Sequence, residues 1–202
     1  AQTSSTVDIS ISAIVQGTTT EEEPTPTPTS SAGGGGAVVT TPGKVVFEGR
    51  AYPTAFLTLL KNGQTAATFF AESSGLFKKE LTGVAGGTYT FGIFAQDTDQ
   101  RKSVTISFTV GVLADMTTTI SGIFLSPTIE LGPTQVDKGE IVNILGQAFP
   151  QSQVDIFIAS AQEIVKEALA DKKGKWQYKL DTGHLEETEH KARAKLTFGD
   201  GE

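Results

Sequence analysis

Apolar and polar residues alternate in short runs over most of the chain, and residues that favour turns separate these runs. "KNGQ" at 61–64 contains the Asn-Gly pair of a tight hairpin, and "ESSG" at 72–75 ends in a glycine that can adopt a positive φ. Runs of this length with turns between them are typical of an antiparallel β-sandwich. Between residues 45 and 110 the pattern predicts strands at 45–49, 56–60, 66–71, 77–81, 89–95 and 104–110.

The same pattern occurs twice. "KVVFEGRAYPTAFLTLL" aligns with "EIVNILGQAFPQSQVDIF" when Gly49 is matched to Gly146, and "AESSGLFKKEL" aligns with "ADKKGKWQYKL" when Gly75 is matched to Gly174. A self-similarity of this length predicts two copies of one structural unit.

One segment of the second copy has the composition of a helix. "EIVKEALADKK" at 163–173 is rich in Glu, Lys, Ala and Leu, but its aligned partner "TAATFFAESS" is not. Because tertiary context commonly overrides intrinsic propensity, the alignment predicts a strand here as well.

Two unlike segments precede the repeats. "VDISIS" at 7–12 alternates as a strand does, whereas "TTTEEEPTPTPTSSAGGGG" at 18–36 has almost no apolar residues. The second tract cannot bury a core and is interpreted as a linker, with hydroxyls that O-linked sugars could decorate.

The repeated motifs resemble those of a known family. G-x-A-x-P, A-[DE]-x-x-G-x-[FW] and the following "GTYTF" or "EHKARA" strand are similar to the bacterial immunoglobulin-like repeats that occur in tandem on cell-surface and secreted proteins. The resemblance covers roughly residues 37–202 and implies a structural or adhesive role, without catalytic residues to carry over.

Composition and net charge limit the classes of partner and the cellular location that we expect for this chain. The chain has 202 residues, 38% of them hydrophobic, and a net charge of −7 that argues against nucleic acid. It has no cysteine, and no apolar run is long enough for a transmembrane helix. "AQTSS" at the start resembles the residue left by a signal peptidase, so we expect a mature secreted chain, the alternative being a chain trimmed at this end.

Comparison of the copies indicates a missing strand. After "GTYTFGIFAQ" the first copy continues with "SVTISFTVG", whereas after "EHKARAKLTF" the sequence has only "GDGE". A sandwich short of a strand exposes backbone groups and an apolar groove. "VDISIS" resembles the absent element and carries the predicted donor residues Val7, Ile9, Ile11 and Ile14.

The groove that receives this strand is predicted in the second domain. Its expected lining residues are Ile156, Ile158, Trp176 and Leu196. Insertion into another copy does not close on itself and propagates a filament. Insertion into the same chain and a sequence that lacks its own last strand remain alternatives.

The sequence gives little support for a catalytic, metal-binding or sugar-binding site. His184 and His190 have no metal-ligand spacing, and no G-x-S-x-G motif occurs. Asp97 and Asp99 could bind Ca²⁺ but are more simply a solvated turn. Trp176 could stack on a sugar, although its alignment with Phe77 favours the core. We therefore expect no enzyme activity, cofactor or metal.

The resulting prediction is an all-β protein of two tandem immunoglobulin-like antiparallel β-sandwiches, secreted to the cell surface. A donor strand (1–17) and a Thr/Pro/Gly linker (18–36) precede domain 1 (37–116) and domain 2 (117–202), which lacks its last strand. We expect a pilus-like filament whose partners are neighbouring copies of itself, with other cells or surfaces as further partners and no nucleic acid or membrane. The alternative is a monomeric adhesin or carbohydrate-binding module.

Overall fold

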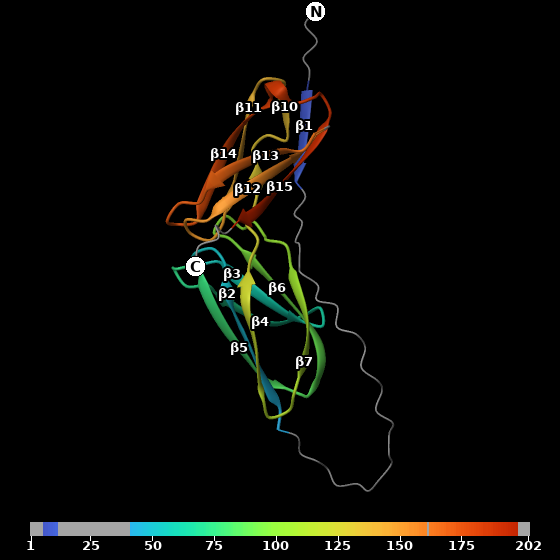
Figure 1. Ribbon diagram of the computed structural model, residues 1–202, viewed down its shortest axis with the longest axis vertical. Helices are drawn as coiled ribbons and strands as arrows, with labels where there is room; N and C mark the ends of the chain where they lie inside the picture. Colours follow the sequence, from blue (N-terminus) through green and yellow to red (C-terminus); the bar gives the residue numbers. More distant parts are fainter. Residues whose placement is uncertain (1–5, 12–40, 161, 198–202) are drawn as a thin grey trace, which may run out of the picture.

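Two β-sandwiches stacked end to end form an elongated molecule (Figure 1). The computed structural model describes residues 6–11, 41–160 and 162–197, with the backbone but not the side chains of 6–11. In these residues the regular elements are β-strands and one short 3₁₀ helix. Two tandem immunoglobulin-like antiparallel sandwiches, the fold class predicted from the sequence, are confirmed.

Domain 1 contains seven strands in two sheets. One sheet has the order β5-β2-β8 and the other β4-β3-β6-β7. The strands are β2 (Gly43–Arg50), β3 (Phe56–Lys61), β4 (Gln64–Phe70), β5 (Leu76–Val84), β6 (Gly87–Gln96), β7 (Ile106–Val112) and β8 (Thr117–Phe124).

The core of domain 1 lies between these sheets because alternate residues of each strand face inward. Phe47 of β2 and Phe91 of β6 are fully buried and meet edge to face, with ring centroids 5.1 Å apart. Tyr52, in the loop after β2, is also fully buried, and its hydroxyl donates a hydrogen bond to the carbonyl oxygen of Ala95 at 3.3 Å. The aromatic residues thus fill the centre of the sandwich.

Domain 2 repeats this plan with a different arrangement at its edges. Its sheets have the orders β14-β11-β9 and β10-β1-β15-β12-β13. The strands are β9 (Glu130–Leu131), β10 (Gln135–Asp137), β11 (Ile141–Gln147), β12 (Gln153–Ala159), β13 (Ile164–Leu169), β14 (Lys175–Asp181) and β15 (Glu189–Thr197), with η1 at Thr182–His184 and β1 at Thr6–Ile11.

Two glycines at aligned positions of the repeats lie where the packing leaves no room for a side chain. A Cβ on Gly49 would collide with the carbonyl oxygen of Ile123 and would lie 2.7 Å from the ring of Phe77. A Cβ on Gly146 would collide with the carbonyl oxygen of Thr128 and would lie 2.9 Å from the ring of Trp176. Glycine is required at both positions because backbone and an aromatic ring approach the same Cα.

Two features bear on the predictions from sequence. Residues 164–169 form strand β13, so the helical propensity of 163–173 is overridden as expected.

Residues 117–124, which we placed in domain 2, form β8 and pair in parallel with β2 of domain 1. The boundary therefore needs correction, because β8 completes the first sandwich and domain 1 extends to Phe124.

No helix in the described residues is long and apolar enough to cross a membrane.

Candidate functional site: the β15 edge and the interdomain junction

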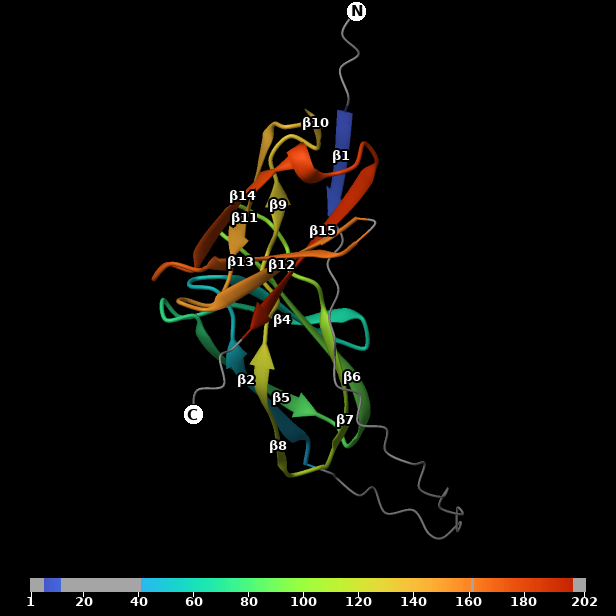
Figure 2. The ribbon, with the colours of Figure 1, turned by 45° about the horizontal axis from the view of Figure 1, so that its top comes forward.

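Strand β1 lies in domain 2 of its own chain, between β10 and β15 (Figure 2). It runs parallel to β15, with Asp8 to Ile11 opposite Glu189 to Ala192. It runs antiparallel to β10, where Thr6, Val7 and Asp8 face Asp137, Val136 and Gln135. The structure therefore has the strand in the same-chain position that sequence reasoning left as an alternative.

The corresponding edge of domain 1 is covered by a strand that runs antiparallel to its neighbour, whereas β1 runs parallel to β15. The core positions Phe91 and Ile93 of β6 correspond to Ala192 and Ala194 of β15, since Leu59 pairs with Ile93 and the aligned Ile156 pairs with Ala194. On β6, strand β7 is antiparallel and pairs with residues 87–93. The two domains thus cover equivalent edges with strands of opposite polarity.

The predicted donor residues fall at defined positions in the register. Ile9 is opposite His190 and Ile11 is opposite Ala192, both of which are buried, and Val7 is opposite the buried Val136. Directly opposed residues share one face of a sheet, so the register alone assigns these three positions to the inner face. Ile14 lies outside the described residues.

The predicted acceptor residues lie deeper in domain 2 than the edge itself. Ile156 and Ile158 are fully buried on β12, and Trp176 of β14 belongs to the same core cluster, against which Leu196 of β15 packs. β12 is separated from β1 by β15. The residues next to β1 are His190 and Ala192, which sequence reasoning did not select.

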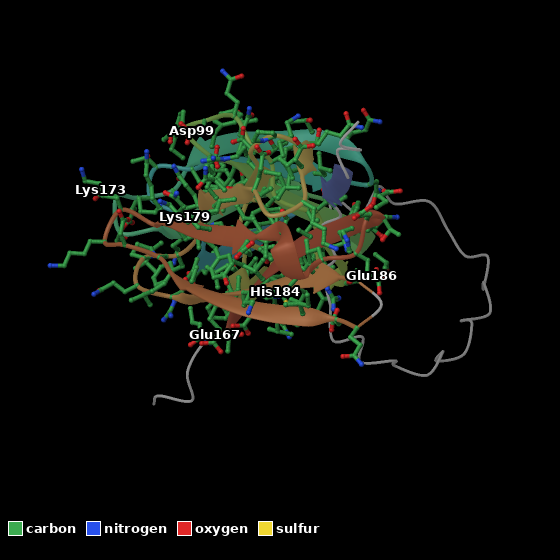
Figure 3. The ribbon with its side chains drawn as sticks, turned by 90° about the horizontal axis from the view of Figure 1, so that it is seen from above. Asp99, Glu167, Lys173, Lys179, His184 and Glu186 are labelled. Atoms are coloured by element: carbon green, nitrogen blue, oxygen red, sulfur yellow. The ribbon has the colours of Figure 1, made fainter. Side chains whose placement is uncertain are left out.

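His190 is anchored at this edge. Its ring is fully buried, with Nδ1 3.2 Å from the carbonyl oxygen of Ala159 and Nε2 2.9 Å from that of Glu186. Both ring nitrogens lie within hydrogen-bond distance of backbone carbonyl oxygens, so the ring is enclosed by its own domain, as expected for a structural strand residue. His184 is the exposed last residue of η1, at the end of domain 2 that Figure 3 shows together with Glu186.

A second cluster of polar residues joins the two domains. Asp97, in the turn after β6, has a fully buried side chain. Its Oδ1 accepts hydrogen bonds from the backbone N–H of Asp99 and Arg101, both at 2.9 Å. Its Oδ2 accepts from Nε of Arg101 and from the hydroxyl of Thr128, both at 2.6 Å. One carboxylate thereby connects the turn of domain 1 to the segment that enters domain 2.

Arg101 extends the cluster. Its guanidinium donates to Asp99 at 2.6 Å and to Glu130 of β9 at 3.0 Å. Burial alone lowers the pKa of Arg101, but the hydrogen bond and charge of Asp97, with Glu130 and Asp99, raise it above its ordinary value. The guanidinium therefore stays charged, and Asp97 and Asp99 are engaged by it.

This arrangement bears on the proposed Ca²⁺ site. In the described part of the chain there is no group of three or more His, Cys, Asp or Glu residues that could hold a metal ion. Asp97 and Asp99 act as partners of Arg101, which supplies the positive charge at this turn.

Apolar contacts surround the junction and use equivalent loops of the two repeats. A Cβ on Gly75 of domain 1 would lie 3.1 Å from the ring of Phe149, and a Cβ on Gly174 of domain 2 would lie 2.9 Å from Cδ of Pro53. The guanidinium of Arg50 lies 5.2 Å from the ring centroid of Phe149. Equivalent ends of the domains therefore face each other.

Sequence reasoning missed most of this junction. Thr128 accepts a hydrogen bond from the backbone N–H of Gln147 at 2.8 Å, and the Gln147 amide donates to Thr98 at 2.7 Å. The available signal was Arg101, which lies four residues after Asp97 in a turn and can therefore reach its carboxylate. The partners in domain 2 have no local signal.

A shallow hollow lies on the outer face of the β5-β2-β8 sheet. Its volume is about 470 Å³, and the residues around it include Glu48, Arg50, Leu76, Lys78 and Phe124. Glu48 and Lys78 form an ion pair at 2.6 Å, and Arg50 lies 5.5 Å from the ring centroid of Phe124. The charged groups here are satisfied by their neighbours.

Comparison with known proteins gives only remote structural likenesses. No family model matches the chain, and no curated protein matches it. A DUF3823 family protein from Parabacteroides merdae is similar at 14% identity and a TM-score of 0.25, over 72% of this chain and 83% of that one.

Two further solved structures have similar scores. A tetra-tandem repeat in the extending region of a large adhesion protein has 16% identity and a TM-score of 0.27, over 78% of this chain and 49% of that one. Fibronectin(III)-like modules of Clostridium thermocellum CbhA have 13% identity and a TM-score of 0.23, over 80% and 92%. Likenesses at this level carry no argument about function.

Proposed function

We propose that this chain is a non-enzymatic structural segment of an extracellular surface protein, in which two immunoglobulin-like domains form one stiff unit that spaces or displays neighbouring parts. The tandem repeat and the Thr/Pro/Gly tract at 18–36 support the proposal, because such stalks and modules are typical of surface proteins.

The interdomain junction is the observation that carries the proposal. Domains joined only by a linker move independently, and a packed polar and apolar interface restricts that motion. Here the buried Asp97 carboxylate bonds to groups from both sides, and Phe149 and Pro53 pack against the opposite domains. A protein that transmits position or force along its length needs such a connection.

Surface labelling of the source cells tests the location. Antibodies raised against domain 1 are expected to label intact cells as strongly as permeabilised ones, with a cytoplasmic protein labelled only after permeabilisation. Labelling that requires permeabilisation would overturn the proposal.

A second candidate function is a filament subunit that donates β1 to a neighbouring copy. The observation that favours it is that β1 pairs with β10 and β15 (Figure 2), and that neither of these strands is joined to β1 by a hairpin turn. Because β1 is joined to domain 1 by the chain from residue 12 to 42, the same contact could be made between molecules.

Electron microscopy tests this candidate. Native material is expected to contain filaments with one subunit per repeat, and a variant lacking residues 1–16 is expected to form none. Uniform monomers of the full chain, at concentrations where the protein is folded, would exclude the filament.

A further inference from the structure

We propose that the outer face of the β4-β3-β6-β7 sheet of domain 1 binds a neutral polysaccharide, whose sugar rings stack on three phenylalanine side chains. This binding activity goes beyond the structural role proposed above, which does not depend on it. We call the surface the aromatic face, and its positions are Phe56, Thr58 and Leu60 of β3, Thr68 and Phe70 of β4, and Phe94 and Gln96 of β6.

The register of the sheet brings the three phenylalanines together. Phe56 of β3 is opposite Phe70 of β4 and Gln96 of β6, and Thr58 is opposite Phe94 of β6. The positions that alternate with these on β3 and β6 are fully buried in the core, so the aromatic face lies on the outer side. The ring centroids of Phe56 and Phe70 are 5.2 Å apart.

The rings lie over the sheet and are open to a partner. Thr58 is on the outer side, yet it is only 8% exposed, which indicates that its larger neighbours cover it. Phe70, in contrast, is 69% exposed. The aromatic face is therefore a packed surface with an accessible ring at its β4 end.

The fold does not require aromatic residues at these positions. The equivalent face of domain 2 is formed by β12, β13 and β15, and its residues aligned with Thr58, Thr68 and Phe94 are Asp155, Glu167 and Lys195, which are paired across the sheet. The same structural unit thus accepts charged side chains here. Exposed apolar clusters that folding does not need are typical of binding surfaces.

The side chains of the aromatic face match the chemistry of a sugar. A pyranose ring has C–H groups that pack on an aromatic ring and hydroxyl groups at its edge that form hydrogen bonds. The Thr68 hydroxyl lies beside the rings, and the Gln96 amide is held by a 3.2 Å hydrogen bond to the carbonyl oxygen of Gln100. Strands β4, β3 and β6 span about 10 Å, which suits a chain of sugars better than one ring.

Charge favours a neutral sugar chain over other apolar partners. None of the positions of the aromatic face is charged, and Lys102 lies at its rim, with Nζ 5.9 Å from the ring centroid of Phe94. Membrane surfaces attract clusters of lysine and arginine, which this face does not have. Two copies of the chain, each with a net charge of −7, repel each other. An uncharged polysaccharide is not repelled.

Affinity gel electrophoresis of the full chain tests the proposal. The neutral probes are mixed-linkage β-glucan, arabinoxylan and galactomannan, and polygalacturonate is the acidic probe. At least one neutral polysaccharide is expected to slow migration relative to albumin, and polygalacturonate is not. No retardation by the three neutral probes, or retardation by polygalacturonate alone, would overturn the proposal and leave the structural role intact.

Phe70→Ala tests whether the aromatic face is the site. The dissociation constant is expected to rise about tenfold or more, because an exposed stacking ring is lost. Leu169→Ala is the matched control, since Leu169 is aligned with Phe70 and is 71% exposed in domain 2. It should leave binding unchanged. Equal weakening by both substitutions, or by neither, would contradict the assignment.

A second variant gives domain 1 the charges of domain 2. T68E/F94K introduces the residues aligned at Glu167 and Lys195, which this fold already accepts. It is expected to abolish retardation, with a circular dichroism spectrum like that of the unsubstituted chain. A folded double variant that binds polysaccharide as before would overturn the proposal.

Sedimentation velocity and pelleting with phosphatidylcholine vesicles test the other possible occupants. Neither self-association nor vesicle binding is expected to depend on Phe70. A dimer that Phe70→Ala dissociates and Leu169→Ala does not would assign the aromatic face to a second copy. Vesicle binding with the same dependence would assign it to lipid, and either result would overturn the proposal.

Discussion

Tyr52 and Phe149 occupy aligned positions but differ in one hydroxyl group, which is buried in domain 1 and bonded to the carbonyl oxygen of Ala95. Burial raises the pKa of the Tyr52 phenol well above its ordinary value, so the hydroxyl remains protonated and a donor. Phe149 instead contacts Gly75 and Arg50 of the other domain. The same position in the repeat thus serves the core in one copy and the junction in the other.

We predict that Tyr52→Phe destabilises domain 1 by about 1 kcal/mol, the usual net value of one buried hydrogen bond. Urea unfolding measures the change. Tyr89→Phe is the matched control, because its hydroxyl bonds to Ala85 at an exposed site, and it should cost less than about 0.5 kcal/mol. Equal effects of the two substitutions would contradict the assignment.

A second prediction concerns the close packing at the repeated glycines. Gly49→Ala and Gly146→Ala should each destabilise their own domain by about 3 kcal/mol or more, because the added methyl group meets a carbonyl oxygen and an aromatic ring. Thermal unfolding followed by circular dichroism measures this. Gly111→Ala, where the methyl group meets nothing within 4 Å, should be neutral or slightly stabilising.

At the scale of elements, the sequence predicts strands well where a local pattern and a repeat agree. The prediction of strand β13 is correct because it followed the alignment with β4 rather than the helical composition of Glu163 to Lys173. β8 was misassigned because "TTTISGIF" follows a turn and has no aligned partner in the second copy. Its place on β2 depends on a parallel contact distant in sequence, which alternation cannot reveal.

The position of β1 shows the same limit. Alternation predicts that Val7, Ile9 and Ile11 share a face, and the two registers of β1 agree, since Ile9 and Ile11 are opposite His190 and Ala192 and Val7 is opposite Val136. It cannot give the direction of the strand, because a period of two reads identically from both ends. His190 and Ala192 were not predicted to lie beside β1 for a related reason, since the sequence of β15 does not show which strand pairs with it.

Removal of residues 1–16 is predicted to weaken domain 2 and leave domain 1 unchanged, because β1 contacts β15 and β10 of domain 2. Differential scanning calorimetry should show the domain 2 transition lowered by several degrees, with hydrogen exchange fastest in β10 and β15. An unchanged domain 2 would indicate that β1 does not stabilise it.

At the scale of the whole molecule, the junction depends on residues from both repeats that only the fold brings together. Asp97 and Arg101 are local in sequence, but Thr128, Glu130 and Gln147 are not. This long-range character explains why the turn "DTDQR" was interpreted as solvated or as a cation site. It also makes the relative position of the domains sensitive to a single substitution.

Arg101→Ala is predicted to destabilise the junction strongly, by about 3–5 kcal/mol, since it leaves the fully buried Asp97 carboxylate without its cation. Chemical unfolding should then separate into two transitions. Lys44→Ala, which removes an exposed ion pair with Glu80, is the control and should cost less than about 1 kcal/mol.

The central claim is that the two domains form one stiff unit, and a distance measurement between them tests it most directly. Spin labels at T109C on β7 and E167C on β13, both exposed, report the separation by double electron–electron resonance in this cysteine-free chain. We predict a single narrow distance distribution that broadens in Arg101→Ala. A broad distribution in the unsubstituted junction, unchanged by Arg101→Ala, would contradict the account.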